Sequence, residues 1–429
     1  MIFDAVIFTL YLSFFVWLIS RMKMFSDHFW KAKYSVIIFL VKIVAGFSLS
    51  WIYTHHYTSR SEADVFRYYD DARLLNDVFY QDKVHFCQMM IGIEDKNDPV
   101  IQDYMKYSDG WRKQTQEYLN DRKVIDFNVF NDHHTITKIN AVLLLFSFGS
   151  YPVHILFFAF LALIGLRLIN QVADHFVFEF SLVRHLLLYL FPSVLIWTSG
   201  ATKEALLVFG IGLLLRHIQL FSKKYDLKHL LFALLACFVI IKSKYFILLL
   251  LIPVIPLLFQ FKKISKTFAV LGFSILVAIL LFSQNGKLFT KQHENKTIIK
   301  TYPNTTVVSP VKELNNDLIN NLESIGQAIT NTYFQPILLP AKSMMVTIAK
   351  AENVLLIILI ILALSQFKAM RKDIFVLLLG TIILSSILIG FSTLIVGNIH
   401  RYKLTPLLII LIVVGQYFPY QYKVNLEHK

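Results

Sequence analysis

Long apolar segments alternate with polar stretches along this chain, and about a dozen apolar segments cover most of its length. An apolar run of about 20 residues can cross the hydrocarbon core of a bilayer as a helix. The pattern therefore predicts an all-α polytopic membrane protein. The expected spans are residues 2–20, 34–54, 152–171, 183–199, 201–219, 227–241, 245–260, 266–283, 352–367, 373–397 and 402–419.

The short apolar stretch 138–149 decides the number of spans. If it is re-entrant or interfacial there are eleven spans, and if it crosses the bilayer there are twelve. Short loops rich in Lys and Arg face the cytoplasm. Eleven spans place all four strongly basic loops (21–33, 216–228, 261–266 and 368–373) on that side. We therefore expect eleven spans, with the N-terminus outside and the C-terminus cytoplasmic.

Two long loops then face outward, within a single integral-membrane domain 1–429. The first, 55–137, lies in a stretch (53–137) that holds 15 of the 28 acidic residues, and we expect it to be helical. The second, 284–351, begins polar. It continues with apolar residues at spacings of three and four from Leu314 to Ile329, a pattern that predicts an amphipathic helix on the outer surface.

Composition agrees with a membrane protein. Hydrophobic residues make up 56% of the chain, whereas charged residues make up 16%, against about 25% in soluble domains. The net charge of +14 does not indicate nucleic-acid binding, because the basic residues cluster in short loops, as expected beside anionic lipid. Cys87 and Cys237 lie in a loop and in an apolar segment, so we expect no disulfide between them.

Three carboxylates stand out in the first long loop, namely Asp64, Asp70 and Asp71 in SEADVFRYYDDA. On a helix, Asp64 and Asp71 share one face with Tyr68 between them. A carboxylate there can accept a proton from a sugar hydroxyl or bind a metal ion. The alternative is a solvated acidic helix face.

Cations also gather at the outer ends of the expected spans, where the charge rule predicts few. A phosphate or pyrophosphate ligand explains such a cluster, because Arg binds it through a planar fork and Lys as a point charge. The candidate phosphate-binding residues are Lys203, Lys242, Lys244, Arg401 and Lys403, with Glu204, His400 and Tyr68 in support.

These candidates have structural alternatives. Lys203 and Glu204 can satisfy each other near the membrane surface, and Arg401 and Lys403 can extend to lipid headgroups. We expect no metal site, because adjacent histidines rarely bind one ion from a single helix. The adjacent pairs are His55–His56 and His133–His134.

Four stretches carry a resemblance to a known family: SEADVFRYYDDARLL, FPSVLIWTSGATKEAL, YFQPILLPAKSMMVTIAKAENVLL and GNIHRYKLTPLL. Together they resemble the polytopic lipid-dependent glycosyltransferases of the GT-C fold, and the pattern is also similar to bacterial polysaccharide polymerases. The chain departs from that family in an additional N-terminal span. It also lacks an Asp-Glu or Glu-Asp dipeptide near the start of the first outer loop, where Glu94-Asp95 comes much later.

The resemblance implies transfer of a sugar from a polyprenyl-phosphate or polyprenyl-diphosphate donor to a glycan or lipid acceptor. The reaction would lie on the outer side of a bacterial inner membrane, in cell-surface glycan assembly. For that reaction we expect Asp64, or failing it Asp70 or Asp71, to act as the general base on the acceptor hydroxyl. Lys203, Arg401 and Lys403 would stabilise the leaving phosphate. A divalent cation as cofactor is left open. The alternatives are a repeat-unit polymerase, a transporter or flippase for lipid-linked glycans, and a non-catalytic scaffold.

Overall fold

The computed structural model describes residues 2–27, 30–56, 59–95, 97–111, 132–176, 181–259, 265–283, 305–315, 317–341 and 343–418. Over these ranges the chain is helical, and its one β-type feature is an isolated bridge between Val307 and Ile395. The all-α class expected from the apolar pattern is confirmed for this part of the chain.

Within the described ranges, seven helices are long and apolar enough to cross a membrane, and an eighth span results if one pair bent by 56° counts as a single span. The bent pair is α20 (Val396–Tyr402) and α21 (Leu404–Gln416). The seven are α1 (Ile2–Arg21), α2 (Ala32–His56), α8 (Tyr151–Phe176), α11 (Lys203–Lys224), α15 (Lys266–Ser283), α18 (Met344–Leu364) and α19 (Lys372–Gly390). These helices support a polytopic integral membrane protein.

Two expected spans are broken. Residues 183–199 form α9 (Leu182–Leu190) and α10 (Pro192–Trp197), and residues 245–260 form α13 (Ile247–Leu251), a 3-10 turn η3 (Ile252–Val254) and α14 (Ile255–Leu258). Prolines at 192, 253 and 256 lack the backbone N–H that a continuous helix needs. The count of eleven spans stays a prediction.

Two further segments differ from a simple span. The helix α12 (Leu227–Lys244) contains three lysines, and α7 (Asp132–Ser147) takes up most of the apolar stretch 138–149. The helix α18 begins eight residues before the expected span 352–367, which moves Glu352 from the start of a helix into its interior.

The chain divides into two compact units. The first unit is Met1–Arg167, Ile196–Ile211 and Ala236–Tyr245, and the second unit is Leu168–Leu195, Gly212–Leu235 and Phe246–Lys429. The single domain expected from the sequence stays a prediction.

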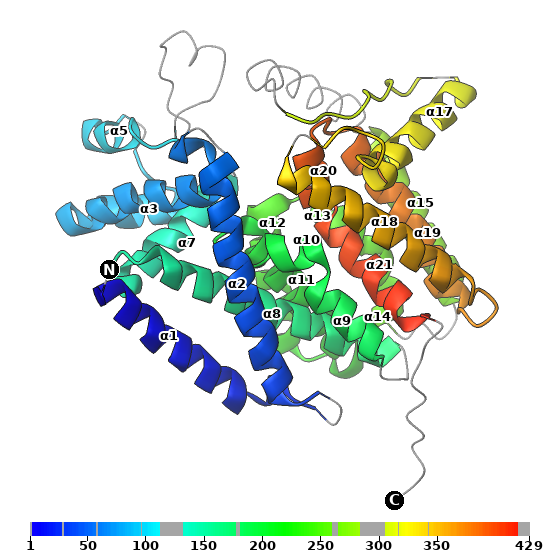
Figure 1. Cartoon of the computed structure of the whole chain (residues 1–429), viewed down its shortest axis with the longest axis horizontal. Helices are drawn as coiled ribbons and strands as arrows, with labels where there is room; N and C mark the ends of the chain where they lie inside the picture. Colours follow the sequence, from blue (N-terminus) through cyan, green and yellow to red (C-terminus); the bar gives the residue numbers. More distant parts are fainter. Residues whose placement is uncertain are drawn as a thin grey trace, which may run out of the picture. The chain divides into compact units, whose positions relative to one another are not determined.

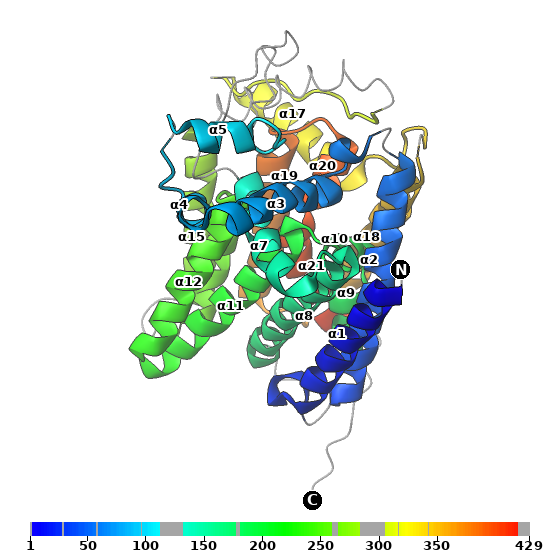
Figure 2. The same cartoon turned by 90° about the vertical axis from the view of Figure 1, so that its left-hand side faces the viewer.

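In the first unit, α1 and α2 form a helical hairpin, and α3 (Asp64–Gln81) runs across the direction of α2 in both views (Figures 1 and 2). The helix α3 packs on α7, and α4 (Lys83–Ile91) and α5 (Pro99–Met105) follow it. Side-chain oxygens of Asp82 and Asp98 cap the starts of α4 and α5. Apolar side chains such as Leu75, Met89 and Trp111 form the core beneath α3.

Close helix packing in the first unit depends on two glycines. A Cβ at Gly46 of α2 would lie 2.4 Å from the carbonyl oxygen of Ser199, and one at Gly165 of α8 would lie 2.4 Å from that of Val208. No side chain fits at either position without a backbone shift. Gly46 therefore holds α2 against the non-helical residues 198–202, which connect α10 to α11.

In the second unit, α19 packs against α15, α21 and α17 (Leu318–Ile329), and α9 packs against α21. The helix α17 is amphipathic: Ile325 and Ala328 pack against the core, while Ile319 is 70% exposed. Leu314 lies before this helix, so the predicted amphipathic pattern is helical only from residue 318 onward.

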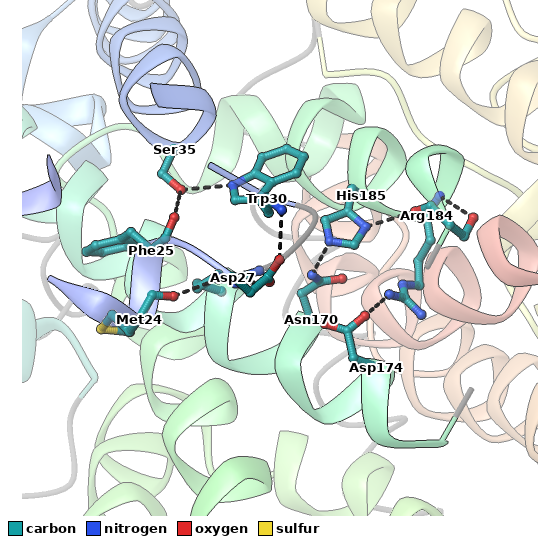
Figure 3. A network of polar contacts seen from close by, with 11 residues as sticks. Met24, Phe25, Asp27, Trp30, Ser35, Asn170, Asp174, Arg184 and His185 are labelled. Carbon is teal, nitrogen blue, oxygen red and sulfur yellow. Dashed lines mark hydrogen bonds and ion pairs between the residues drawn. The ribbon is translucent and has the colours of Figure 1, made fainter. Parts of the chain in front are cut away.

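Within each unit, polar contacts connect residues near the ends of helices (Figure 3). In the first unit, Trp30 donates from its indole to Ser35 (2.9 Å) and from its backbone to Asp27 (2.7 Å), and Arg167 also pairs with Asp27. In the second unit, Arg184 pairs with Asp174.

Candidate functional site

The three candidate carboxylates of α3 have different surroundings. Asp64, the first residue of the helix, accepts a hydrogen bond from the Arg67 guanidinium at 2.7 Å, and its side chain is 25% exposed. Asp70 forms a surface ion pair with Arg60 at 2.7 Å. Asp71 is buried. Of the two on the inner face, only Asp64 remains partly accessible.

Asp71 joins three parts of the first unit. Its carboxylate accepts backbone hydrogen bonds from Asp109 (2.9 Å) and Gly110 (2.7 Å) and one from the His133 ring at 2.7 Å. The neighbouring His134 donates to the Gly110 carbonyl oxygen at 3.0 Å. These contacts give Asp71 a structural role. They also give His133 and His134 hydrogen-bond partners within the protein.

Lys203 and Tyr68 meet although they are far apart in the sequence. The Lys203 ammonium lies 5.6 Å from the centroid of the Tyr68 ring, and that ring packs edge-on against His133 at 4.8 Å. Tyr68 lies one helical turn from both Asp64 and Asp71, as the spacing predicted. The first unit thus brings part of the acidic loop to the start of α11.

Glu204 has a partner on another helix. It accepts a hydrogen bond from Lys244 of α12 at 3.0 Å, and both side chains are buried. Lys242 instead lies 5.8 Å from the ring of Phe238. The candidate phosphate-binding lysines 203, 242 and 244 therefore differ in the side chains they contact, and the charge of Lys244 is already neutralised by Glu204.

Arg67 was missed from the sequence, although its place one turn after Asp64 was a usable signal. Burial by itself would lower the pKa of the Arg67 guanidinium, but nearby anionic groups, led by Asp64, outweigh this and raise that pKa. Arg67 is therefore a permanent cation. Asp64, Arg67 and Lys203 are half-buried around the buried Tyr68, and this group can both accept a proton and hold an oxyanion.

The second unit contains a different polar cluster, centred on Glu352 of α18. Its carboxylate accepts hydrogen bonds from the backbone N–H and the hydroxyl of Ser193, both at 2.7 Å. The Nδ1 atom of His400 lies 3.6 Å away and the Lys403 ammonium 4.0 Å away. Lys403 also donates to Asn353 at 2.5 Å. All five side chains are buried, so Lys403 is neutralised inside the unit.

This cluster lies where two helices are interrupted. Ser193 follows the break between α9 and α10, and Lys403 is at the bend between α20 and α21. The Nε2 atom of His400 is buried without a hydrogen-bond partner. Arg401 is half-buried in the same segment. Sequence reasoning singled out His400 and Lys403, but it did not identify Ser193 or Asn353 as their partners.

No group of three or more His, Cys, Asp or Glu side chains suitable for a metal ion occurs in the described ranges. No protein-family model, characterised protein or solved structure matches this chain.

The two inner carboxylates of α3 should differ in their contribution to stability. Asp71→Asn should lower the free energy of unfolding by about 1.5–3 kcal/mol, because an amide oxygen cannot replace a carboxylate that accepts three hydrogen bonds. Asp64→Asn is the matched control and should cost much less. Unfolding of both purified variants in the same detergent measures this, and equal losses would contradict the structural role of Asp71.

Proposed function

We propose that this protein is a membrane glycosyltransferase that uses a polyprenyl-phosphate or polyprenyl-diphosphate sugar donor. The acceptor would be a glycan or lipid on the outer face of a bacterial inner membrane, in cell-surface glycan assembly. The observation that carries the proposal is the α3 group, in which Asp64, Arg67 and Tyr68 lie together and Lys203 reaches Tyr68 from α11.

Asp64 is our candidate for the general base. Asp71 is buried and accepts three hydrogen bonds, and Asp70 lies at the surface in an ion pair with Arg60. Asp64 is also paired, with Arg67, but it lies at the start of α3 and is partly enclosed yet accessible. In the reaction, the carboxylate takes the proton of the acceptor hydroxyl. The freed oxygen attacks the anomeric carbon of the donor, and the bond from that carbon to the phosphate oxygen breaks.

Lys203 is our candidate for stabilising the leaving group. The electron pair of the broken bond remains on the phosphate, so negative charge grows there in the transition state. Lys203 is the first residue of α11, and the start of a long helix attracts anions. Arg67 would keep Asp64 ionised and oriented. Arg401 and Lys403 lie in the second unit, and their binding of the donor phosphate stays a prediction.

The exposed surface of α2 is apolar and can contact the polyprenyl chain of a lipid-linked donor. Val44 and Phe47 are exposed along the helix, and Trp51 is exposed near its end. Tryptophans are enriched where a membrane meets water. A donor whose phosphate lies at that level can keep its polyprenyl chain in the hydrocarbon core.

A second candidate function is transport of a lipid-linked glycan. Transporter sites are commonly built from interrupted helices and buried ionisable groups. The Glu352 cluster in the second unit combines both features. We favour the enzyme because the α3 group lies in an acid-rich segment and includes Asp64, whose partly exposed carboxylate an acceptor can reach.

Asp64→Asn should lower the rate of sugar transfer by about 10²–10⁴-fold, because the acceptor hydroxyl loses its base. The assay is release of polyprenyl phosphate by the purified protein from a panel of polyprenyl-linked sugars. Asp70→Asn is the matched control and should keep its activity, since Asp70 is paired at the surface. Full activity of a well-expressed Asp64→Asn protein would exclude Asp64 as the base.

Proteoliposomes separate the two candidate functions. We expect no protein-dependent translocation of a fluorescent polyprenyl-linked sugar, because the proposed chemistry takes place on one side of the membrane. The matched variants are Glu352→Gln and Asp64→Asn. Translocation that Glu352→Gln abolishes and Asp64→Asn preserves would favour the transporter instead.

The proposed orientation predicts which positions face outward. In a background with both native cysteines replaced by serine, cysteines introduced at positions 90 and 300 should react with a membrane-impermeant thiol reagent in intact cells. Cysteines at 225 and 425 should react only after the membrane is opened, because they would lie on the cytoplasmic side. Reaction at 225 in intact cells would overturn this topology.

A further inference from the structure

Four of the buried basic side chains in the described ranges have a carboxylate within ion-pair distance. An unmatched charge inside an apolar bundle costs several kcal/mol, so such pairing is expected. The pairs are Arg167 with Asp27, Arg184 with Asp174, Lys244 with Glu204, and Lys403 with Glu352.

Lys42 differs from these four. It lies well inside α2, its side chain is fully buried, and its polar contact is the hydroxyl of Thr198 at 2.5 Å. No carboxylate of the described ranges lies within ion-pair distance of its ammonium. A hydroxyl is a weak partner for a full positive charge. Among the described residues of the first unit, this buried lysine therefore has no counter-charge.

The chain opposite Lys42 is not helical. Residues 198–202 run between α10 and α11 outside any helix, and the hydroxyl-bearing residues Thr198, Ser199 and Thr202 are all buried. Non-helical backbone at membrane depth is tolerated where it is enclosed by protein or lines a polar cavity. Lys42 thus faces a short polar segment inside an otherwise apolar part of the first unit.

The position of Lys42 also separates it from the α3 group. Along α2, Lys42 meets Thr198, Gly46 meets Ser199, and Leu49 meets Gly200. A helix rises 1.5 Å per residue, so Leu49 lies about 10 Å farther along the axis than Lys42. Lys203 follows still later in the chain. An anion at Lys42 would therefore lie deeper along α2 than one held at the start of α11.

We propose that Lys42 and the segment 198–202 form an anion site that binds a phosphate or phosphodiester group. The Lys42 ammonium is a charge-assisted hydrogen-bond donor, and phosphate oxygens accept such bonds. The Thr202 hydroxyl donates to the Trp197 carbonyl oxygen at 2.8 Å, so the ammonium is the donor on which the site depends. The bound anion supplies the missing counter-charge. Residues 198–202 are not held in a helix, so the segment opposite Lys42 can shift to admit a ligand without breaking an α-helix. The site does not depend on the proposed glycosyl transfer.

The test measures thermal unfolding of the full-length purified protein in detergent with three probes: undecaprenyl phosphate, inorganic phosphate and undecaprenol. For the unaltered protein, we expect a concentration-dependent rise in Tm with a phosphate-bearing probe and none with undecaprenol. A rise with both phosphates identifies the phosphate group itself as sufficient. A rise with undecaprenyl phosphate alone identifies a lipid source.

Lys42→Met should weaken this response at least about tenfold in apparent affinity, because one charge-assisted hydrogen bond is lost. Without any probe its Tm should equal or exceed that of the unaltered protein, because the unmatched charge is gone. Arg167→Met is the matched control: it should lower Tm by removing the buried partner of Asp27, while keeping the response to phosphate. Asp64→Asn should also keep the Tm response to phosphate. The anion site and the proposed glycosyl transfer are therefore tested independently of each other.

If Lys42→Met does not fold, Thr198→Val provides the second variant, and it should also weaken the phosphate response. The absence of any Tm rise in the unaltered protein with either phosphate probe would overturn the proposal. So would an unchanged response in a folded Lys42→Met protein. Either result would leave Lys42 a purely structural role.

Discussion

A charge inside a bundle of apolar helices has to be matched by an opposite charge, and in this protein the matching joins distant parts of the chain. Glu204 and Lys244 connect the start of α11 to the end of α12. Arg167 connects α8 to the segment that links α1 and α2. Breaking such a pair leaves a buried charge uncompensated, which costs about 3–5 kcal/mol. These pairs therefore constrain how the helices pack.

The same constraint separates the three aspartates of α3. The buried Asp71 is satisfied by backbone N–H groups and a histidine, so it organises the loop around residues 109–110. Asp70 faces outward and pairs with Arg60 at the surface. Asp64 lies between these extremes, half-buried beside Arg67. A carboxylate used in catalysis needs both accessibility and a controlled charge environment, and this position offers both.

Interruptions of helices bring polar groups into the interior. The break before α10 supplies the Ser193 N–H to Glu352, and the bend at Lys403 points its ammonium toward Asn353. The break after α10 places Thr198 beside Lys42. A regular helix uses its backbone groups internally, whereas an interrupted one releases them for other partners. Both candidate polar centres and the proposed anion site depend on such interruptions.

Helix type, the membrane character and the shared face of Asp64, Tyr68 and Asp71 could be predicted from the sequence. These properties depend on local length and periodicity, which any stretch of chain carries by itself. The span count was harder to predict, because prolines divide apolar runs that look continuous in hydropathy.

Charge partners were decided by the tertiary structure alone. Glu204 pairs with Lys244 of α12, forty residues later in the chain, and nothing local in the sequence predicted that partner. Lys42 stands out in the sequence as a charged residue within the expected span 34–54, but only the packing of α2 on residues 198–202 shows that its side chain is buried against a hydroxyl. Which groups meet across a bundle depends on how helices distant in the sequence pack, and no local pattern encodes that.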